Sequence, residues 1–175
     1  MLVFFRAFLA AILVGILSVS TAVAAEKIAV VDTAVAIFGS ATAKNKFKEA
    51  EQSADFLALK AKYESSTADF QAMMKEAESK RLTWSQEEAA EHQKKMGYAK
   101  ADADLAIQKI KAEDQQLRQS IYKQLMPLAS LALQEIVKEE SITLLLRAES
   151  ILLVAPELEI TAKLADRIDQ KAAKK

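Results

Sequence analysis

The chain has 175 residues, and its 24 basic and 24 acidic side chains cancel at neutral pH, which argues against a nucleic-acid-binding protein with its basic surface. The absence of cysteine excludes a disulfide framework and thiolate chemistry. Three glycines and two prolines leave little material for loops and predict long uninterrupted helices.

Residues 1–24 have the pattern of a cleavable signal peptide. Arg6 precedes an apolar run over residues 7–19, and a small-x-small pattern follows at residues 22–24. The run is shorter than the roughly 20 apolar residues that a membrane-spanning helix needs. We therefore expect cleavage after Ala24 and an exported, soluble mature protein. An uncleaved membrane anchor is the alternative.

The mature chain opens with a predicted strand, KIAVVD. Ile28 and Val30 lie on one of its alternating faces, and Ala29 and Val31 lie on the other. A strand that is apolar on both faces is typical of one that is buried on both sides. The segment TAVAIFGS that follows predicts a turn or a short helix.

Two long helices then predict an antiparallel helical hairpin. Residues 41–80 contain no proline or glycine, and Ser85 with Glu88 forms a capping-box pattern that predicts a turn at residues 82–84 before a second helix. The second helix is expected from Gln86 to Met126, so both helices would be roughly 60 Å long and would return the chain to the first strand. Apolar or small residues at helical spacing line each helix: Phe56, Leu59, Tyr63, Phe70, Met73 and Ala77 in the first, and Ala89, His92, Met96, Ala99, Ala103, Ala106, Ile110, Leu117, Ile121 and Leu125 in the second.

The C-terminal segment predicts a buried helix, two more strands and a closing helix. Pro127 is expected to bend the second helix. The apolar segment LASLALQEIVKEE follows, and then ITLLLR and ILLV are typical of strands joined by the turn AES. Pro156 ends the second of these strands, and ELEITAKLADRIDQ predicts an amphipathic helix.

Together these elements predict an α+β fold that is mostly α. Residues 25–40 and 127–175 would form a body with a three-stranded sheet, and residues 41–126 would form a coiled-coil arm. Such a small sheet with exposed edges is unstable alone and invites pairing with other chains, so we expect the body to oligomerise. A charge placed at Leu145 or Leu153 is expected to break the oligomer before it unfolds the arm. The expected oligomerisation residues are Ile28, Val30, Val31, Leu144, Leu145, Leu146, Ile151 and Leu153.

The order of five segments resembles the Skp/OmpH family of periplasmic chaperones. These segments are the strand KIAVVD, the charged hairpin, IYKQLMPLASLALQEIVKEE, ITLLLRAESILLV and PELEITAKLADRI. The resemblance implies a jellyfish-shaped homotrimer in which strands of three chains build the body and three arms enclose a cavity. It also implies a holdase that uses no ATP and no cofactor. Such a protein binds unfolded outer-membrane β-barrel proteins in the periplasm and prevents their aggregation before membrane insertion.

Two features depart from the family pattern. Family arms are often markedly basic, whereas basic and acidic residues nearly balance between Lys44 and Lys123. Long-range steering of acidic clients should therefore be weak, and a lipopolysaccharide-binding role is not carried over. The glycine often found before the second strand is missing, and Glu140 and Ser141 stand in its place.

A holdase needs adaptable apolar side chains, such as methionine and aromatic residues. Those on the shared stripe could instead hold the two helices together, whereas Met74 and Tyr98 lie off the seams. Trp84, at the predicted tip, could touch a client or a membrane surface, or cap the hairpin. The candidate client-binding residues are Phe56, Tyr63, Phe70, Met73, Met74, Trp84, Met96 and Tyr98.

Other residues argue against enzymatic and metal-binding functions. His92 has no partner at metal-ligand spacing, and acids such as Glu87, Glu88 and Glu91 are typical of a solvated helix face. Gly97 is either a flexible point of the arm or a neutral residue on a solvated face. The alternatives to a chaperone are an adaptor coiled coil of the cell envelope and a lipid-surface protein, although the apolar stripe is narrow for the latter.

Overall fold

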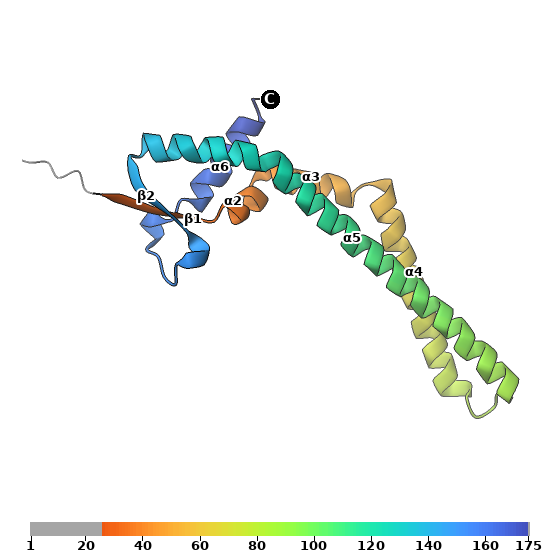
Figure 1. The fold of residues 1–175 in the computed structure, drawn as a ribbon. Coiled ribbons are helices and arrows are strands. Elements are labelled where there is room, and N and C mark those ends of the chain that lie inside the picture. Colours follow the sequence, from red (N-terminus) through yellow and green to blue (C-terminus); the bar gives the residue numbers. More distant parts are fainter. Residues whose placement is uncertain (1–25, 175) are drawn as a thin grey trace, which may run out of the picture.

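The computed structural model describes residues 26–174, so the predicted signal peptide lies outside the described residues. Figure 1 shows a body at one end of the molecule and a two-helix arm that projects from it. The elements in chain order are β1 (Lys27–Val31), α2 (Thr33–Gly39), α3 (Ala41–Glu51), α4 (Ala54–Lys80), α5 (Gln86–Glu139), β2 (Ile142–Arg147), the 3-10 turns η1 (Ala148–Ser150) and η2 (Pro156–Leu158), and α6 (Thr161–Ala172).

The sheet of the body is parallel and has two strands, β1 and β2, in the part of the chain that the structure describes. Ile28 pairs with Leu144 and Val30 with Leu146, so these four residues share one face. The whole arm connects the two strands, and parallel pairing requires a crossover connection of this kind. The predicted opening strand is therefore confirmed.

The predicted third strand, ILLV, is wrong. After β2 the chain turns through η1, where the Ile151 N–H donates to the Ala148 carbonyl at 3.0 Å. Residues 151–155 then run without strand pairing. The second edge of β1 is instead met by the segment before α6, because the Ile160 N–H donates to the Val30 carbonyl at 2.9 Å. An apolar pattern alone cannot reveal that a segment lacks a strand partner.

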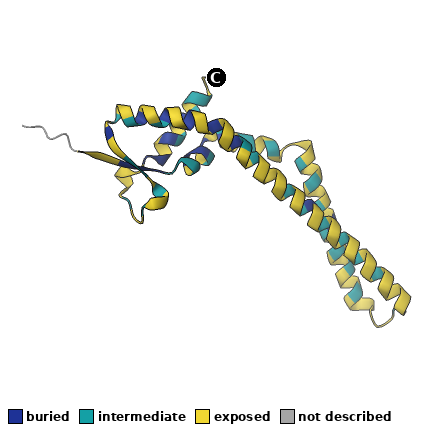
Figure 2. Ribbon diagram, in the orientation of Figure 1, coloured by how far each residue is buried: buried dark blue, intermediate teal, exposed yellow. Residues whose placement is uncertain are grey.

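The hydrophobic core lies between β1, α2, the C-terminal part of α5 and α6 (Figure 2). Ile160, Leu164 and Ile168 are buried at the four-residue spacing predicted for the closing helix. The core also takes Ala43 and Ile121 from the range predicted as arm. Buried side chains are concentrated in the body, and most of the arm surface is exposed (Figure 2).

The prediction of one helix over residues 41–80 is wrong, because the run is broken between α3 and α4. Ser53 has an extended backbone, and its hydroxyl accepts the Phe56 N–H at 3.2 Å, so it caps a new helix. A serine that satisfies the backbone in this way competes with a continuous helix. Figure 1 shows that the chain changes direction at this break.

The second arm helix begins where it is predicted to begin. The Glu88 N–H donates to the Ser85 hydroxyl at 3.2 Å, and the Ser85 N–H donates to the Glu88 carboxylate at 2.7 Å. The capping box is thus confirmed. Pro127 does not end this helix: α5 has 54 residues and passes through it. Figure 1 shows α5 changing direction where it enters the body.

Candidate functional site

The predicted stripe of α4 is half-buried along the arm. Phe56, Tyr63, Phe70 and Met73 lie at positions that are neither buried nor fully exposed, as does Met96 on α5. Along the hairpin, the Lys62 ammonium and the Asp102 carboxylate are 2.6 Å apart and link α4 to α5. The spacing and burial of these five side chains favour a role in holding the two helices together.

Other apolar side chains of the arm are exposed to solvent. Tyr98 is 62% exposed and Met74 is 42% exposed, as expected for residues off the seams. Leu57 and Leu105 are also half exposed, and sequence reasoning did not single them out. Tyr98 and Leu105 are seven residues apart on α5 and therefore lie on one helix face. The sequence feature that could have indicated Leu57 and Leu105 is an apolar residue outside the regular helical stripe.

Trp84 packs onto the end of the hairpin. Its ring centroid lies 4.4 Å from that of His92, with the two rings tilted by 38°. Trp84 is half-buried, which fits a local cap of the turn. Leu82, which lies in the predicted turn, is 90% exposed at the tip. The most exposed apolar side chain there is therefore Leu82 and not Trp84.

His92 is half-buried beside Trp84, and its Nε2 atom is buried and makes no hydrogen bond in the described part of the chain. The Glu76 carboxylate is 3.5 Å away, which is long for a hydrogen bond. Glu76 instead accepts from the Lys80 ammonium at 3.0 Å, and this contact lowers the pKa of Glu76. Within residues 26–174 no cluster of three or more acidic, histidine or cysteine side chains could hold a metal ion.

Gly97 lies inside α5, and a Cβ atom added there would meet nothing within 4 Å. Neither packing nor backbone conformation therefore requires glycine at this position. The helix is continuous on both sides of it. Its role as a flexible point stays a prediction.

The sheet of the body has one core face and one more open face. Leu145 packs against the core, whereas Ile28 and Leu144 on the opposite face are 37% and 47% exposed. Val30 on that face is buried and Leu146 is half-buried. In the described chain β2 pairs with β1 alone, so its other edge is free.

The loop after β2 carries further exposed leucines. Leu153 is 91% exposed, and Leu152, which sequence reasoning did not select, is fully exposed. Ile151 is half-buried and has an extended backbone. We call Ile28, Leu144, Leu152 and Leu153 the body apolar surface. Full exposure of two neighbouring leucines in an ordered loop is typical of a contact with another chain.

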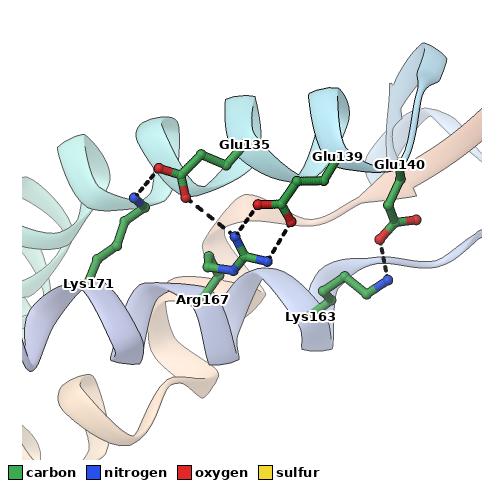
Figure 3. Close-up of polar contacts among 6 residues, drawn as sticks. All are labelled: Glu135, Glu139, Glu140, Lys163, Arg167 and Lys171. Atoms are coloured by element: carbon green, nitrogen blue, oxygen red, sulfur yellow. Dashed lines mark hydrogen bonds and ion pairs between the residues drawn. The ribbon is translucent and has the colours of Figure 1, made fainter.

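Ion pairs link the end of α5 to α6 on the surface of the body (Figure 3). The Arg167 guanidinium binds both carboxylate oxygens of Glu139, at 2.9 and 2.7 Å, and Lys171 binds Glu135 at 2.6 Å. Glu140 accepts hydrogen bonds from both Lys27 and Lys163. We call these contacts the α5–α6 ladder, and it ties the first strand and the last helix to the end of α5.

These contacts change the acidity of the ladder carboxyls. The hydrogen bond from Lys171 lowers the pKa of Glu135, and that from Arg167 lowers the pKa of Glu139. The bonds from Lys163 and Lys27 lower the pKa of Glu140 in the same way. All three carboxyls are therefore held in their ionised form, which is the form that joins the two helices.

A comparison with protein families identifies the family of this chain. A family model described as outer membrane protein (OmpH-like) matches residues 27–168. The chain belongs to this OmpH-like family. Among solved structures, a candidate OmpH-like outer membrane chaperone from Caulobacter crescentus is 14% identical, with 83% of this chain and 85% of that chain covered and a TM-score of 0.48. No curated protein gives a significant match.

Membership of the OmpH-like family confirms the resemblance that the order of the five segments indicated. The matched range begins at β1 and ends within α6, so it includes both the body and the arm. Within residues 26–174 no helix has the length and apolar character needed to cross a membrane.

Proposed function

We propose that this OmpH-like protein is a holdase chaperone of the periplasm that uses no ATP. It binds unfolded outer-membrane β-barrel proteins and prevents their aggregation before membrane insertion. The observation that carries the proposal is the projecting arm with exposed apolar side chains, in a chain of this family. Scattered apolar side chains on a charged surface suit weak contacts with clients of no fixed shape.

The exposed residues are the first candidates for client contact. Tyr98, Leu105, Met74 and Leu57 offer apolar surface that the hairpin itself does not cover. Five half-buried side chains both pack in the hairpin seam and keep some exposed surface. Through that exposed surface they contribute to client binding. They are Phe56, Tyr63, Phe70, Met73 and Met96. If the arm tip contacts a membrane surface, Leu82 makes that contact rather than Trp84, because Leu82 is the more exposed of the two.

The functional unit in this proposal is a homotrimer built through the body. Its support is the body apolar surface and the free edge of β2, because an uncovered edge beside exposed leucines favours pairing with a second chain. Residues 25–40 and 127–175 would form the oligomerisation body, and residues 41–126 the arm. Mass measurement of the mature protein tests the trimer directly.

Aggregation suppression tests the chaperone activity. A urea-unfolded outer-membrane β-barrel is diluted into buffer with the purified protein, and light scattering is followed. We expect suppression at one trimer per client, and scattering equal to that of the client alone would contradict the proposal. An adaptor with fixed folded partners would give that negative result.

A matched pair of variants tests the arm. The double variant Tyr98→Ser with Leu105→Ser removes exposed apolar surface from α5 and should weaken suppression. Ala101→Ser changes an exposed residue of the same helix without removing a large apolar side chain, so it serves as the control.

A further inference from the structure

A groove opens where α3 and α4 separate. It has a volume of about 220 Å³. The apolar residues that line it are half-buried and form its floor, whereas the polar residues that line it, three of them acidic, are exposed and form its mouth. The floor residues are Phe47, Ala50, Phe56, Ile110 and Leu117, and the mouth residues are Glu51, Ser53, Glu113 and Asp114.

The break between the helices produces the groove. Ser53 caps α4, so the α4 helix starts in a new direction, and the apolar faces of α3 and α4 no longer form one continuous layer on α5. Phe47 before the break and Phe56 after it both remain beside the groove. The rings therefore stay half-buried without filling the space between them.

The size and lining of the groove fit an aromatic ring. An apolar cavity of about 150 Å³ is large enough to bind benzene. The groove exceeds that volume and presents two phenylalanine rings together with aliphatic side chains. A bound ring would gain contacts with both phenylalanines, which aromatic pairs make favourably in offset or tilted geometry.

The mouth of the groove favours positive charge. Asp114 is already bound by the Arg118 guanidinium, with Nε 2.8 Å from the carboxylate. That guanidinium lies 5.1 Å from the centre of the Phe47 ring. Glu51 and Glu113 make no ion pair with any residue in the part of the chain that the structure describes. Two exposed carboxylates are therefore open to a cation on a ligand.

We propose that this groove binds an aromatic side chain flanked by lysine or arginine in an unfolded polypeptide. The ring enters the apolar floor, and the flanking cations reach Glu51 and Glu113. The inference rests on the proposed function, since it gives the client segment a defined chemistry. It also explains how a nearly neutral arm selects among unfolded chains: one local acidic mouth acts where long-range steering is absent.

Fluorine NMR on a short peptide tests this binding without an aggregating client. The probe is an acetylated, amidated pentapeptide with 4-fluorophenylalanine between two pairs of lysines, titrated with the mature protein. We expect the fluorine line to broaden and shift on binding, and to recover at high salt because the ion pairs are exposed. Peptides with glutamate in place of lysine, or with alanine in place of the ring, should bind much more weakly. Equal binding of all three peptides overturns the proposal.

Two kinds of variant place the peptide in the groove. The double variant Glu51→Gln with Glu113→Gln removes both free charges, and the dissociation constant should rise about tenfold, since each exposed ion pair contributes about fivefold at most. Asp69→Asn changes an exposed acid elsewhere on α4 and should leave binding unchanged. Ala50→Leu fills the floor and should abolish binding, whereas Ala58→Leu at an exposed position should not. Thermal melting verifies that each variant is folded.

The outcomes separate this inference from the holdase proposal. Suppressed aggregation together with peptide binding that the groove variants leave unchanged overturns the inference alone. If the unaltered protein binds the peptide, the groove variants do not, and aggregation is not suppressed, the groove inference is supported and the holdase proposal is contradicted. A fall in oligomer mass for Ala50→Leu, with no peptide binding to the unaltered protein, makes the groove a contact between copies and overturns the inference.

Discussion

Ser141 shows how one residue carries a local conformational cost. It has a φ of 54°, and it is the only residue other than glycine with positive φ in the part of the chain that the structure describes. It follows the C-cap Glu140, and its N–H donates to the Lys138 carbonyl at 3.3 Å. This left-handed conformation ends many helices and is usually taken by glycine. The glycine that the family often has before the second strand is missing, and Ser141 adopts the left-handed conformation near that position instead.

Ser141→Gly should therefore stabilise the protein. Removing the Cβ atom relieves a penalty of roughly 1 kcal/mol for the left-handed conformation, and the melting temperature should rise by about 2–4 °C for a chain of this size. Thermal denaturation followed by circular dichroism measures the effect. Ser65→Gly, at an exposed position inside α4, should lower the melting temperature. A lower melting temperature for Ser141→Gly contradicts this account.

Gly97 presents the opposite case, since nothing in the structure requires glycine there. Gly97→Ala should stabilise α5 by about 1 kcal/mol, and the same thermal denaturation measures it. The variant should suppress aggregation of large and small clients as the unaltered protein does. If suppression is lost for large clients alone, Gly97 acts as a flexible point of the arm.

At the scale of elements, helix ends and helix contacts depend on side chains far apart in sequence. Asp169 of α6 accepts hydrogen bonds from the backbone N–H groups of Ala41 and Thr42, each at 2.8 Å, and thus caps the start of α3. Burial by itself would raise the pKa of Asp169, but these bonds, together with that of the Thr42 hydroxyl, outweigh it and lower the pKa. No local pattern around Ala41 could have indicated this partner.

The α5–α6 ladder should make the body sensitive to acid. The pKa values of Glu135, Glu139 and Glu140 are lower in the folded chain than in the unfolded one. Their contribution to stability is therefore complete above the ordinary glutamate range and is lost as the pH falls through the lowered values. Thermal melts from neutral pH to about pH 3 should show the melting temperature decreasing.

A variant that replaces one ladder carboxylate by an uncharged amide isolates this effect. Glu139→Gln removes the carboxylate that binds Arg167, so the variant should be less stable at neutral pH and should lose less stability on acidification. Glu78→Gln, an exposed acid of the arm, serves as the control and should retain the full dependence on pH. If the melting temperatures of Glu139→Gln and of the unaltered protein fall in parallel as the pH is lowered, the ladder does not cause the acid sensitivity.

At the scale of the whole molecule, the first strand and the last elements of the described chain depend on each other, and the proposed trimer would add contacts with other copies. The sheet joins β1 to β2 across the entire arm, and Ile28 and Leu144 on its open face and the leucines of the following loop remain exposed. From sequence, a charge at Leu145 or at Leu153 is predicted to have the same effect. The structure separates them, because Leu145 packs against the core whereas Leu153 is 91% exposed.

Leu153→Glu is therefore the cleaner test of association. A charge in an apolar contact between chains is costly to bury, so the variant should dissociate to monomers. Size-exclusion chromatography with light scattering measures the mass, and far-ultraviolet circular dichroism should show an unchanged helical content. Leu82→Glu makes the same change at an equally exposed leucine of the arm tip and should leave the mass unchanged. An oligomer that survives Leu153→Glu contradicts association through this surface.

The candidate site was predictable in part. Half-burial of the α4 stripe and exposure of Tyr98 follow from helical spacing, which places residues three, four and seven apart on one face. The groove could not be predicted, because it exists only where the Ser53 cap breaks a run that has every other property of one helix. Leu152 was missed since exposure in a loop follows no periodicity.

The sequence by itself determined the features that depend on near neighbours in the chain. The capping box at Ser85, the long helices, the buried spacing of α6 and the opening strand all result from contacts or periodicities within a few residues. Only the tertiary structure decided the features that depend on distant partners. The parallel pairing of β1 with β2, the unpaired loop at Leu153 and the cap that Asp169 places on α3 join segments more than a hundred residues apart or lack a partner in this chain. Because such contacts depend on which surfaces meet in space, local sequence patterns do not encode them.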